Sequence, residues 1–350
     1  MDETEQREIE DRLKERIAAY HEAALLFTAV TAGLPDLLKA EPRDPETLAT
    51  DLGLAPGPMR RFLRGLVAMR LCEERDDGRF ALTPAADCLT HGNPSNLSEK
   101  AFVVVGQYWM PWMSMMYSLR TGEPSLPFAL NKTAADWRGA KSEEGRFLFR
   151  YVAKDEMSNP EGVREALGDI PEGSVIASLG GGYGAWLANV LERDLSLKGV
   201  VVDAPPILDD AMRLFDVLEF ADRIEFLPGD VREEVPAGAD IYVLKSMLQQ
   251  HGDKDAAAIL ENCRKAMSSG ERPGARLVIY ERLMPEDASE DPEAIMLDLH
   301  MMAITGGQAR KLAEMEALIG GAGLRLAGHR KTGNGMTALD VRTPESETQD

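Results

Sequence analysis

One stretch constrains the fold of this chain most. The apolar run Val175–Leu179 enters the glycine cluster Gly180–Gly184 and leaves as a helical pattern, Ala185–Arg193. The run predicts a buried strand, and the apolar spacing after the glycines predicts a helix. Glycine tolerates positive φ and lets a ligand approach the backbone, while the first amides of the helix have no helical partner. The stretch therefore predicts a strand, a tight turn and a helix whose turn can bind a polar cofactor.

A second apolar run supports this interpretation. Val200–Val202 ends in Asp203, at about the 20-residue spacing from the glycines at which a carboxylate can hydrogen-bond the ribose hydroxyls of a nucleoside. A glycine cluster alone also occurs in ordinary loops, so the paired signal favours a nucleoside cofactor more strongly than either part does.

From residue 175 onward, strand-like and helix-like segments alternate, which predicts an α/β fold with a Rossmann-like, doubly wound and mostly parallel sheet. The expected strands are 175–179, 199–203, 223–227, 240–244, 275–281, 324–330 and 336–342, and the expected helices are 186–193, 206–219, 254–268 and 311–322. Ligands bind such sheets at the carboxyl ends of the strands. The polar or glycine positions expected at that edge are Gly180–Gly184, Asp203, Asp230, Lys245 and Glu281.

The N-terminal part has a different pattern. Residues 4–40 are expected to form amphipathic helices, and residues 44–82 have the outline of a winged helix, with two helices and a hairpin around Asp77 and Gly78. Arg60, Arg61 and Arg64 leave a DNA-binding regulator open as an alternative. The formal net charge of −20 argues against nucleic acid and against an anionic membrane surface, so packing or dimerisation is the favoured role.

Residues 98–150 are expected to be mostly helical, with a surface excursion at 120–145 before a helix at 146–157. They contain the dense run YWMPWMSMMY at 108–117, whose aromatic and methionine side chains can fill a core or line an adaptable apolar pocket. The three cysteines are far apart, which predicts free thiols. A charged N-terminus and the lack of a long apolar segment predict a cytoplasmic protein without a membrane partner.

Several ordered blocks together resemble one family. They are SLGGGYG, VVDAPP, FLPGDVREEVPAGADIYVLKSML, LENCRKAM, RLVIYERLMP, MLDLHMMAITGG and ALIGGAGL. The chain resembles the S-adenosylmethionine-dependent small-molecule O-methyltransferases with an N-terminal winged-helix dimerisation domain, the plant phenolic and bacterial antibiotic-tailoring group. The resemblance implies a class I methyltransferase fold, a homodimer and an aromatic or natural-product acceptor. It also implies a dimerisation domain at 1–100, connecting helices that line the acceptor pocket at 101–170, and a cofactor-binding domain at 171–345.

The resemblance assigns S-adenosylmethionine contacts by position. Gly180 and Gly182 would pass under the methionine part and Asp203 would bind the ribose. Asp230 and Val231 would flank the adenine, and Lys245 and Ser246 would complete the pocket. Ser178 replaces the aspartate that usually begins the glycine motif. The candidate acceptor-lining residues are Trp109, Trp112, Met113, Met296 and Met301.

The acid–base positions depart from the family pattern. Members that methylate oxygen usually have histidine, aspartate and tryptophan where this chain has Gln249, Gln250 and His251. A glutamine amide is not a useful general base near neutral pH. Of the two glutamates that orient the family histidine, one is kept as Glu281, and the other position is Ala309.

Three alternatives follow. His251 or His300 takes over as the base for an O-methyl transfer. Alternatively, a carbon or nitrogen acceptor needs no base and relies on positioning. In the third, the cofactor is bound without methyl donation, in a hydroxylase, decarboxylase or cyclase. No metal is expected, because the position next to His251 is Gln250, a poor metal ligand.

Overall fold

The computed structural model describes residues 2–132, 148, 151–154, 161–215, 221–269, 272 and 274–344. The chain divides into two compact units, Met1–Trp109 and Met110–Asp350. Among the described residues, no single helix is long and apolar enough to cross a membrane. One bent pair, Glu3–Thr31 with Leu34–Ala40, meets that test only jointly.

The first unit is mostly helical. It contains α1 (Glu3–Ala18), α2 (Tyr20–Thr31), α3 (Leu34–Ala40), α4 (Pro45–Asp51), α5 (Pro56–Ala68), β1 (Cys72–Glu74), β2 (Phe80–Leu82), η1 (Pro84–Leu89) and most of α6 (Leu97–Met113). The predicted hairpin is confirmed, since β1 and β2 pair antiparallel and Gly78 has a φ of +79° between them. Leu48, Leu63, Leu66 and Phe80 form the centre of its core.

Two of the three arginines of α5 that suggested a DNA reader, Arg60 and Arg64, are paired within this unit. Arg60 lies 3.3 Å from Glu46, and Nε of Arg64 lies 3.1 Å from Oε2 of Glu74. The positive charges of Arg60 and Arg64 are therefore paired with carboxylates of α4 and β1.

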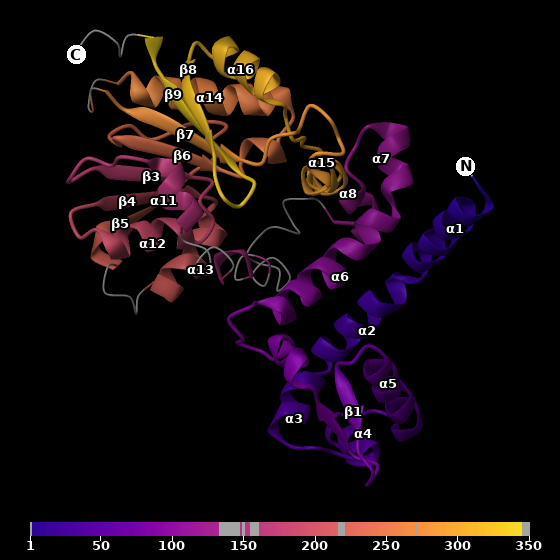
Figure 1. Ribbon diagram of the computed structural model, residues 1–350. Coiled ribbons are helices and arrows are strands. Elements are labelled where there is room, and N and C mark those ends of the chain that lie inside the picture. Colours follow the sequence, from indigo (N-terminus) through magenta and orange to yellow (C-terminus); the bar gives the residue numbers. More distant parts are fainter. Residues whose placement is uncertain are drawn as a thin grey trace. The chain divides into compact units, whose positions relative to one another are not determined.

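The second unit holds a seven-stranded sheet in the order β5-β4-β3-β6-β7-β9-β8 (Figure 1). The strands are β3 (Val175–Leu179), β4 (Lys198–Asp203), β5 (Ile224–Pro228), β6 (Ile241–Lys245), β7 (Arg276–Glu281), β8 (Arg325–Lys331) and β9 (Thr337–Arg342). β3 to β7 are parallel, and β9 pairs antiparallel with β7 and β8. The predicted doubly wound sheet is confirmed, with each strand within one residue of its expected start.

Helices cover both faces of the sheet (Figure 1). On one face, α14 (Asp253–Met267) and α16 (Leu312–Gly321) pack with Ala177, Leu244 and Ile279. On the other face, α11 (Glu161–Leu167), α12 (Ala185–Arg193) and α13 (Pro205–Phe215) pack with Ile176, Val201 and Val243. Strand neighbours such as Ile176 and Ala177 point to opposite faces, so each apolar strand is buried on both sides.

Among the described residues, the second unit also contains the helices α7 (Met115–Thr121), α8 (Ser125–Leu130) and α15 (Pro292–Ile304). α15 packs against α7 and α8. The expected surface excursion at 120–145 is wrong in its first part, because α8 is helical and Ser125 and Leu126 are fully buried. Residues 133–145 lie outside the described residues. The expected helix at 146–157 is described only at 148 and 151–154, all of which are helical.

Candidate active site

The turn after β3 has the conformation that its glycines allow. Gly180, Gly182 and Gly184 have φ values of +64°, +57° and +74°, which side chains rarely adopt. The amide of Gly180 donates to the carbonyl of Val202 at 2.9 Å, which ties the turn to the end of β4. A Cβ on Gly180 would lie 2.5 Å from the sulfur of Met247. Residue 180 must therefore be glycine for two reasons. Met247, just after β6, leaves no room for a Cβ, and the backbone has a positive φ.

Asp203, at the end of β4, organises the same turn. Its Oδ2 accepts from the amide of Gly182 at 2.8 Å, and its Oδ1 accepts from the amide of Ala204 at 2.7 Å. The glycine turn and the predicted ribose carboxylate are thus in direct contact. A carboxylate can accept several hydrogen bonds at once, so holding the turn and binding a diol are compatible roles.

Tyr183 anchors the turn from the other side. It is buried, and its hydroxyl donates to the carboxylate of Asp210 on α13. No sequence signal predicts this link, because an exposed turn tyrosine and a buried one have the same local pattern.

Asp230 and Val231 follow β5 at the same edge of the sheet. The amide of Gly229 donates to the carbonyl of Asp203 at 3.1 Å, so this segment adjoins the end of β4. Hydrogen bonds from Arg232 hold the pKa of Asp230 below its usual range, and the charge of a protonated His251 adds to that effect. Val231 is buried, and its carbonyl accepts from the side chain of Asn262 at 3.2 Å.

Lys245 and Ser246 lie where β6 ends. Ser246 has a φ of +51°, a left-handed conformation that costs a non-glycine residue free energy and is often found at functional turns. The side chain of Gln250 folds back and donates to the carbonyl of Ser246 at 2.6 Å. No sequence signal marks this conformation, since glycine or asparagine is the usual residue there.

Gln249 and Glu281 meet just beyond this turn. Oε1 of Glu281 accepts from the amides of Leu248 at 2.6 Å and of Gln249 at 3.1 Å. Both side chains are buried, with residue exposures of 2% for Glu281 and 5% for Gln249. Burial raises the pKa of Glu281 to about 7 despite those amides and the nearby charge of Arg310. The retained glutamate therefore holds the backbone of η3 (Leu248–Gln250).

The segment 306–310 also contacts η3 and the residue that follows it. Arg310 is buried and donates to the carbonyl of Leu248 at 3.1 Å and to that of His251 at 2.9 Å, and it also pairs with Asp253. A Cβ on Gly307 would lie 2.3 Å from the carbonyl oxygen of Gln249. Ala309 has no side-chain polar group, but its amide donates to Asp298 on α15 at 2.8 Å.

The two candidate histidines have different surroundings. His251 lies within electrostatic reach of Asp230, on the predicted adenine side. His300 is on α15, and its Nδ1 accepts from the indole of Trp112 at 3.1 Å, with the two rings stacked at 6.2 Å. A ring nitrogen that accepts carries no proton, so neutral His300 has its proton on Nε2. His300 then offers a donor at that nitrogen rather than a lone pair.

The acceptor-lining candidates differ in exposure. Met113 and Met296 are 72% and 54% exposed, whereas Met301 is buried. Trp112 contacts His300, as described. Trp109 belongs to the first unit, where its ring lies 6.5 Å from that of Tyr20. The role of these residues toward an acceptor stays a prediction.

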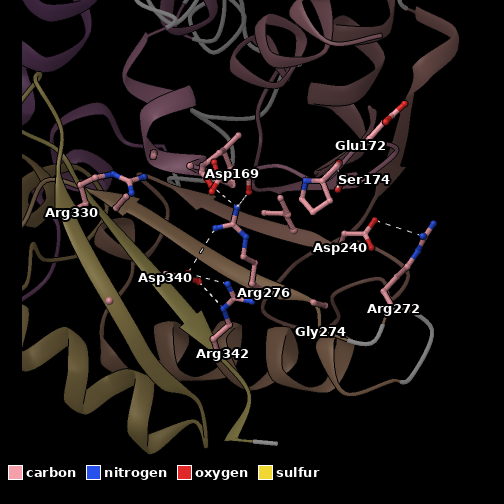
Figure 2. Close-up of a pocket in the computed structure, with 18 of the residues that line it drawn as sticks. Asp169, Glu172, Ser174, Asp240, Arg272, Gly274, Arg276, Arg330, Asp340 and Arg342 are labelled. Carbon is pink, nitrogen blue, oxygen red and sulfur yellow. Dashed lines mark hydrogen bonds and ion pairs between the residues drawn. The ribbon is translucent and has the colours of Figure 1, made fainter. Parts of the chain in front are cut away.

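A cavity of about 630 Å³ lies at the opposite edge of the sheet, where β3, β6 and β7 begin. Figure 2 shows Arg276 and Arg342 flanking Asp340, and Arg272 facing Asp240. Arg276 also donates to the carbonyl of Asp169 at 3.0 Å, just beyond α11. Arg272, Arg276 and Arg342 thus pair with carboxylates of this cavity or complete the end of a helix, and the residues of the glycine turn are not among those that line it.

The glycine turn after β3, the carboxylate after β4 and the observed strand order together define a class I S-adenosylmethionine-dependent methyltransferase. The residues present fit that cofactor, because the turn admits no Cβ at Gly180 and a carboxylate lies beside it. S-adenosylmethionine supplies an electrophilic methyl group when it is bound.

The chain belongs to the O-methyltransferase family. Residues 142–325 match the model of the O-methyltransferase domain, and residues 15–92 match that of the O-methyltransferase dimerisation domain. The chain is 30% identical over 335 residues to the O-demethylpuromycin-O-methyltransferase of Streptomyces alboniger, covering 95% of this chain and 88% of that protein.

Two further comparisons show the range of the family. The chain is 28% identical over 330 residues to the 8-amino-8-demethylriboflavin N,N-dimethyltransferase of Streptomyces davaonensis, covering 91% of each chain. It also resembles the crystal structure of CalO1, a methyltransferase of calicheamicin biosynthesis in its S-adenosylhomocysteine-bound form. That likeness has a TM-score of 0.75 and 28% identity, and covers 98% of this chain and 99% of the other. The enzyme is therefore an S-adenosylmethionine-dependent methyltransferase that acts on small natural-product acceptors.

Proposed function

We propose that this enzyme methylates an aromatic acceptor at an atom that needs no deprotonation by the side chain at position 249. The observation that carries the proposal is the buried Gln249, held by Glu281 at the position of the family's histidine. An amide cannot remove a proton near neutral pH. Rate enhancement then comes from alignment of the acceptor with the methyl group, which can supply several kcal/mol.

The geometry of the two histidines supports this choice over an O-methyl transfer with a substitute base. His300 accepts a hydrogen bond from Trp112 at Nδ1, so its neutral form carries a proton on the other nitrogen. His251 lies within electrostatic reach of Asp230, on the predicted adenine side of the site. A relative named as an N,N-dimethyltransferase is consistent with a nitrogen acceptor in this family.

Within this proposal, Gly180, Gly182, Asp203, Asp230, Val231, Lys245 and Ser246 bind S-adenosylmethionine, and Trp112, Met296 and Met301 contact the acceptor. The protein acts in the cytoplasm as a homodimer formed through its dimerisation domain.

The test is an assay of S-adenosylhomocysteine release with a panel of aromatic acceptors and isotopically labelled methyl. We expect stoichiometric S-adenosylhomocysteine and labelled product. Conversion of an acceptor without S-adenosylhomocysteine would contradict the proposal and favour a hydroxylase, decarboxylase or cyclase that uses the cofactor without methyl transfer.

A further inference from the structure

The side-chain amide of Gln249 is an unusual buried group. The residue is 5% exposed, and within the described part of the chain its Oε1 is buried with no hydrogen-bond partner. Buried polar atoms in folded proteins are nearly always paired, and an orphan requires an explanation. A ligand that brings a hydrogen-bond donor to this oxygen provides one.

The backbone of Gln249 is held in place, so it cannot shift to bring the side-chain oxygen to a partner. Its amide donates to Glu281 at 3.1 Å, and the carbonyls of its neighbours Leu248 and His251 accept from the buried Arg310. Gly307 lies so close to the carbonyl of Gln249 that no Cβ would fit between them. The unpaired amide is thus built into a rigid segment.

That segment lies at the ligand-binding edge of the sheet. η3 follows β6 directly, and Met247, two residues before Gln249, lies against Gly180 of the glycine turn. α15 packs against η3 and carries His300, which is bound to Trp112. Gln249 is therefore next to both the predicted cofactor turn and the helix with the acceptor-side candidates.

We propose that Gln249 determines specificity by accepting a hydrogen bond from the reacting amino group of an aromatic amine. The inference rests on the proposed function and narrows it to a nitrogen acceptor. An amine keeps a lone pair for attack while its N–H pairs with Oε1. A neutral hydroxyl becomes a strong nucleophile only after it loses its proton, which an amide cannot accept. A carbon acceptor brings no strong donor and leaves the oxygen unpaired.

The step balances without a protein base. The amine nitrogen forms a bond to the methyl carbon with its lone pair, and the bond between that carbon and sulfur breaks with its electron pair going to sulfur. The nitrogen then carries a positive charge and releases one proton to water. Aromatic ammonium ions are acidic enough to do so at neutral pH.

The first test compares the wild type with Gln249→His on matched probes, naphthalene and phenazine rings that carry an amino group or a hydroxyl at the same carbon. At pH 7 the wild type should release S-adenosylhomocysteine at least tenfold faster with the amine than with its hydroxyl partner. Gln249→His should raise the hydroxyl rate at least tenfold, with a pH profile that follows imidazole ionisation. Gln6→His makes the same change at an exposed site on α1 and should leave both rates unchanged.

The second test measures binding and does not depend on turnover. With S-adenosylhomocysteine present, calorimetry should show that Gln249→Leu binds the amine probe at least fivefold more weakly than the wild type. The ring without its amino group should bind both proteins equally. Circular dichroism confirms that the variant is folded.

The outcomes separate the inference from the function on which it rests. A wild type that prefers the hydroxyl probe, or Gln249→Leu that binds the amine as tightly, overturns the role of Gln249. A wild type that binds S-adenosylmethionine but releases no S-adenosylhomocysteine with any probe contradicts the proposed function itself.

Discussion

At the residue scale, the site is dominated by polar groups that are buried and held by backbone. Glu281 has kept its family identity although the histidine that it would orient is absent, and here it accepts from two amides of η3. Ser246, just before η3, adopts a left-handed conformation. These positions show that the segment retains its shape while its acid–base chemistry has changed.

The buried carboxyl of Glu281 should affect stability as pH changes. Its pKa is raised from 4.5 to about 7, so the folded state binds more protons than the unfolded state between these values. Stability should therefore fall as pH rises from about 4.5 to 7, by at most about 4 kcal/mol at about 1.4 kcal/mol per pKa unit. Glu281→Gln should remove this decrease, as measured by urea unfolding at several pH values.

Glu290→Gln, which changes an exposed carboxyl, is the matched control for Glu281→Gln and should keep the wild-type slope. Equal slopes in the wild type and Glu281→Gln would show that Glu281 does not titrate in this range.

At the scale of elements, the glycine turn between β3 and α12 packs directly against the end of β4 and the segment after β6. Gly180 donates to Val202 and touches the Met247 side chain, whereas Gly173, with a φ of +75°, has nothing within 4 Å of a Cβ position. The two glycines therefore share a left-handed backbone conformation but not the same surroundings.

Gly180→Ala should weaken S-adenosylmethionine binding at least tenfold, because the new methyl group pushes Met247 and the turn apart. Gly173→Ala should cost only the strain of a left-handed alanine, about 1–2 kcal/mol of stability, without changing affinity. Calorimetry and thermal unfolding distinguish the two effects. Equal affinities in both variants would mean that the turn does not need its close approach at Gly180.

Elements also differ in how well the sequence predicts them. The strands of the sheet were predicted closely because short apolar runs between turn residues are a local signal. α15 was not predicted, because its own apolar residues, such as Met296, Leu299 and Met302, lie on several sides of the helix. The sequence therefore shows no clear helical periodicity there. α8 was missed because Gly122 and Pro124 precede a very short helix that itself contains Pro127.

At the scale of the whole molecule, the first unit leaves apolar surface that the second copy of a dimer can cover. α1 buries none of its residues, all of which the structure describes, and it exposes Leu13 and Ile17. The match to a dimerisation domain begins at residue 15, within this helix.

Light scattering should therefore give the mass of a dimer, and Leu13→Glu combined with Ile17→Glu should give a monomer. Leu195→Glu is the matched control, because Leu195 is 79% exposed on the second unit. A dimer that persists in the α1 variant would show that α1 does not form the interface.

The sequence by itself determined the strands of the sheet and the glycine turn with its partner Asp203, and its resemblance to the family indicated the loss of the usual base at position 249. The first two features follow from periodicity and φ preference, which belong to short stretches of chain. Only the tertiary structure decided that the amide of Gln249 is buried without a partner, that Arg310 fixes η3, and that Trp112 binds His300, 188 residues away. Burial and long-range hydrogen bonds depend on how distant elements pack, and no local pattern encodes them.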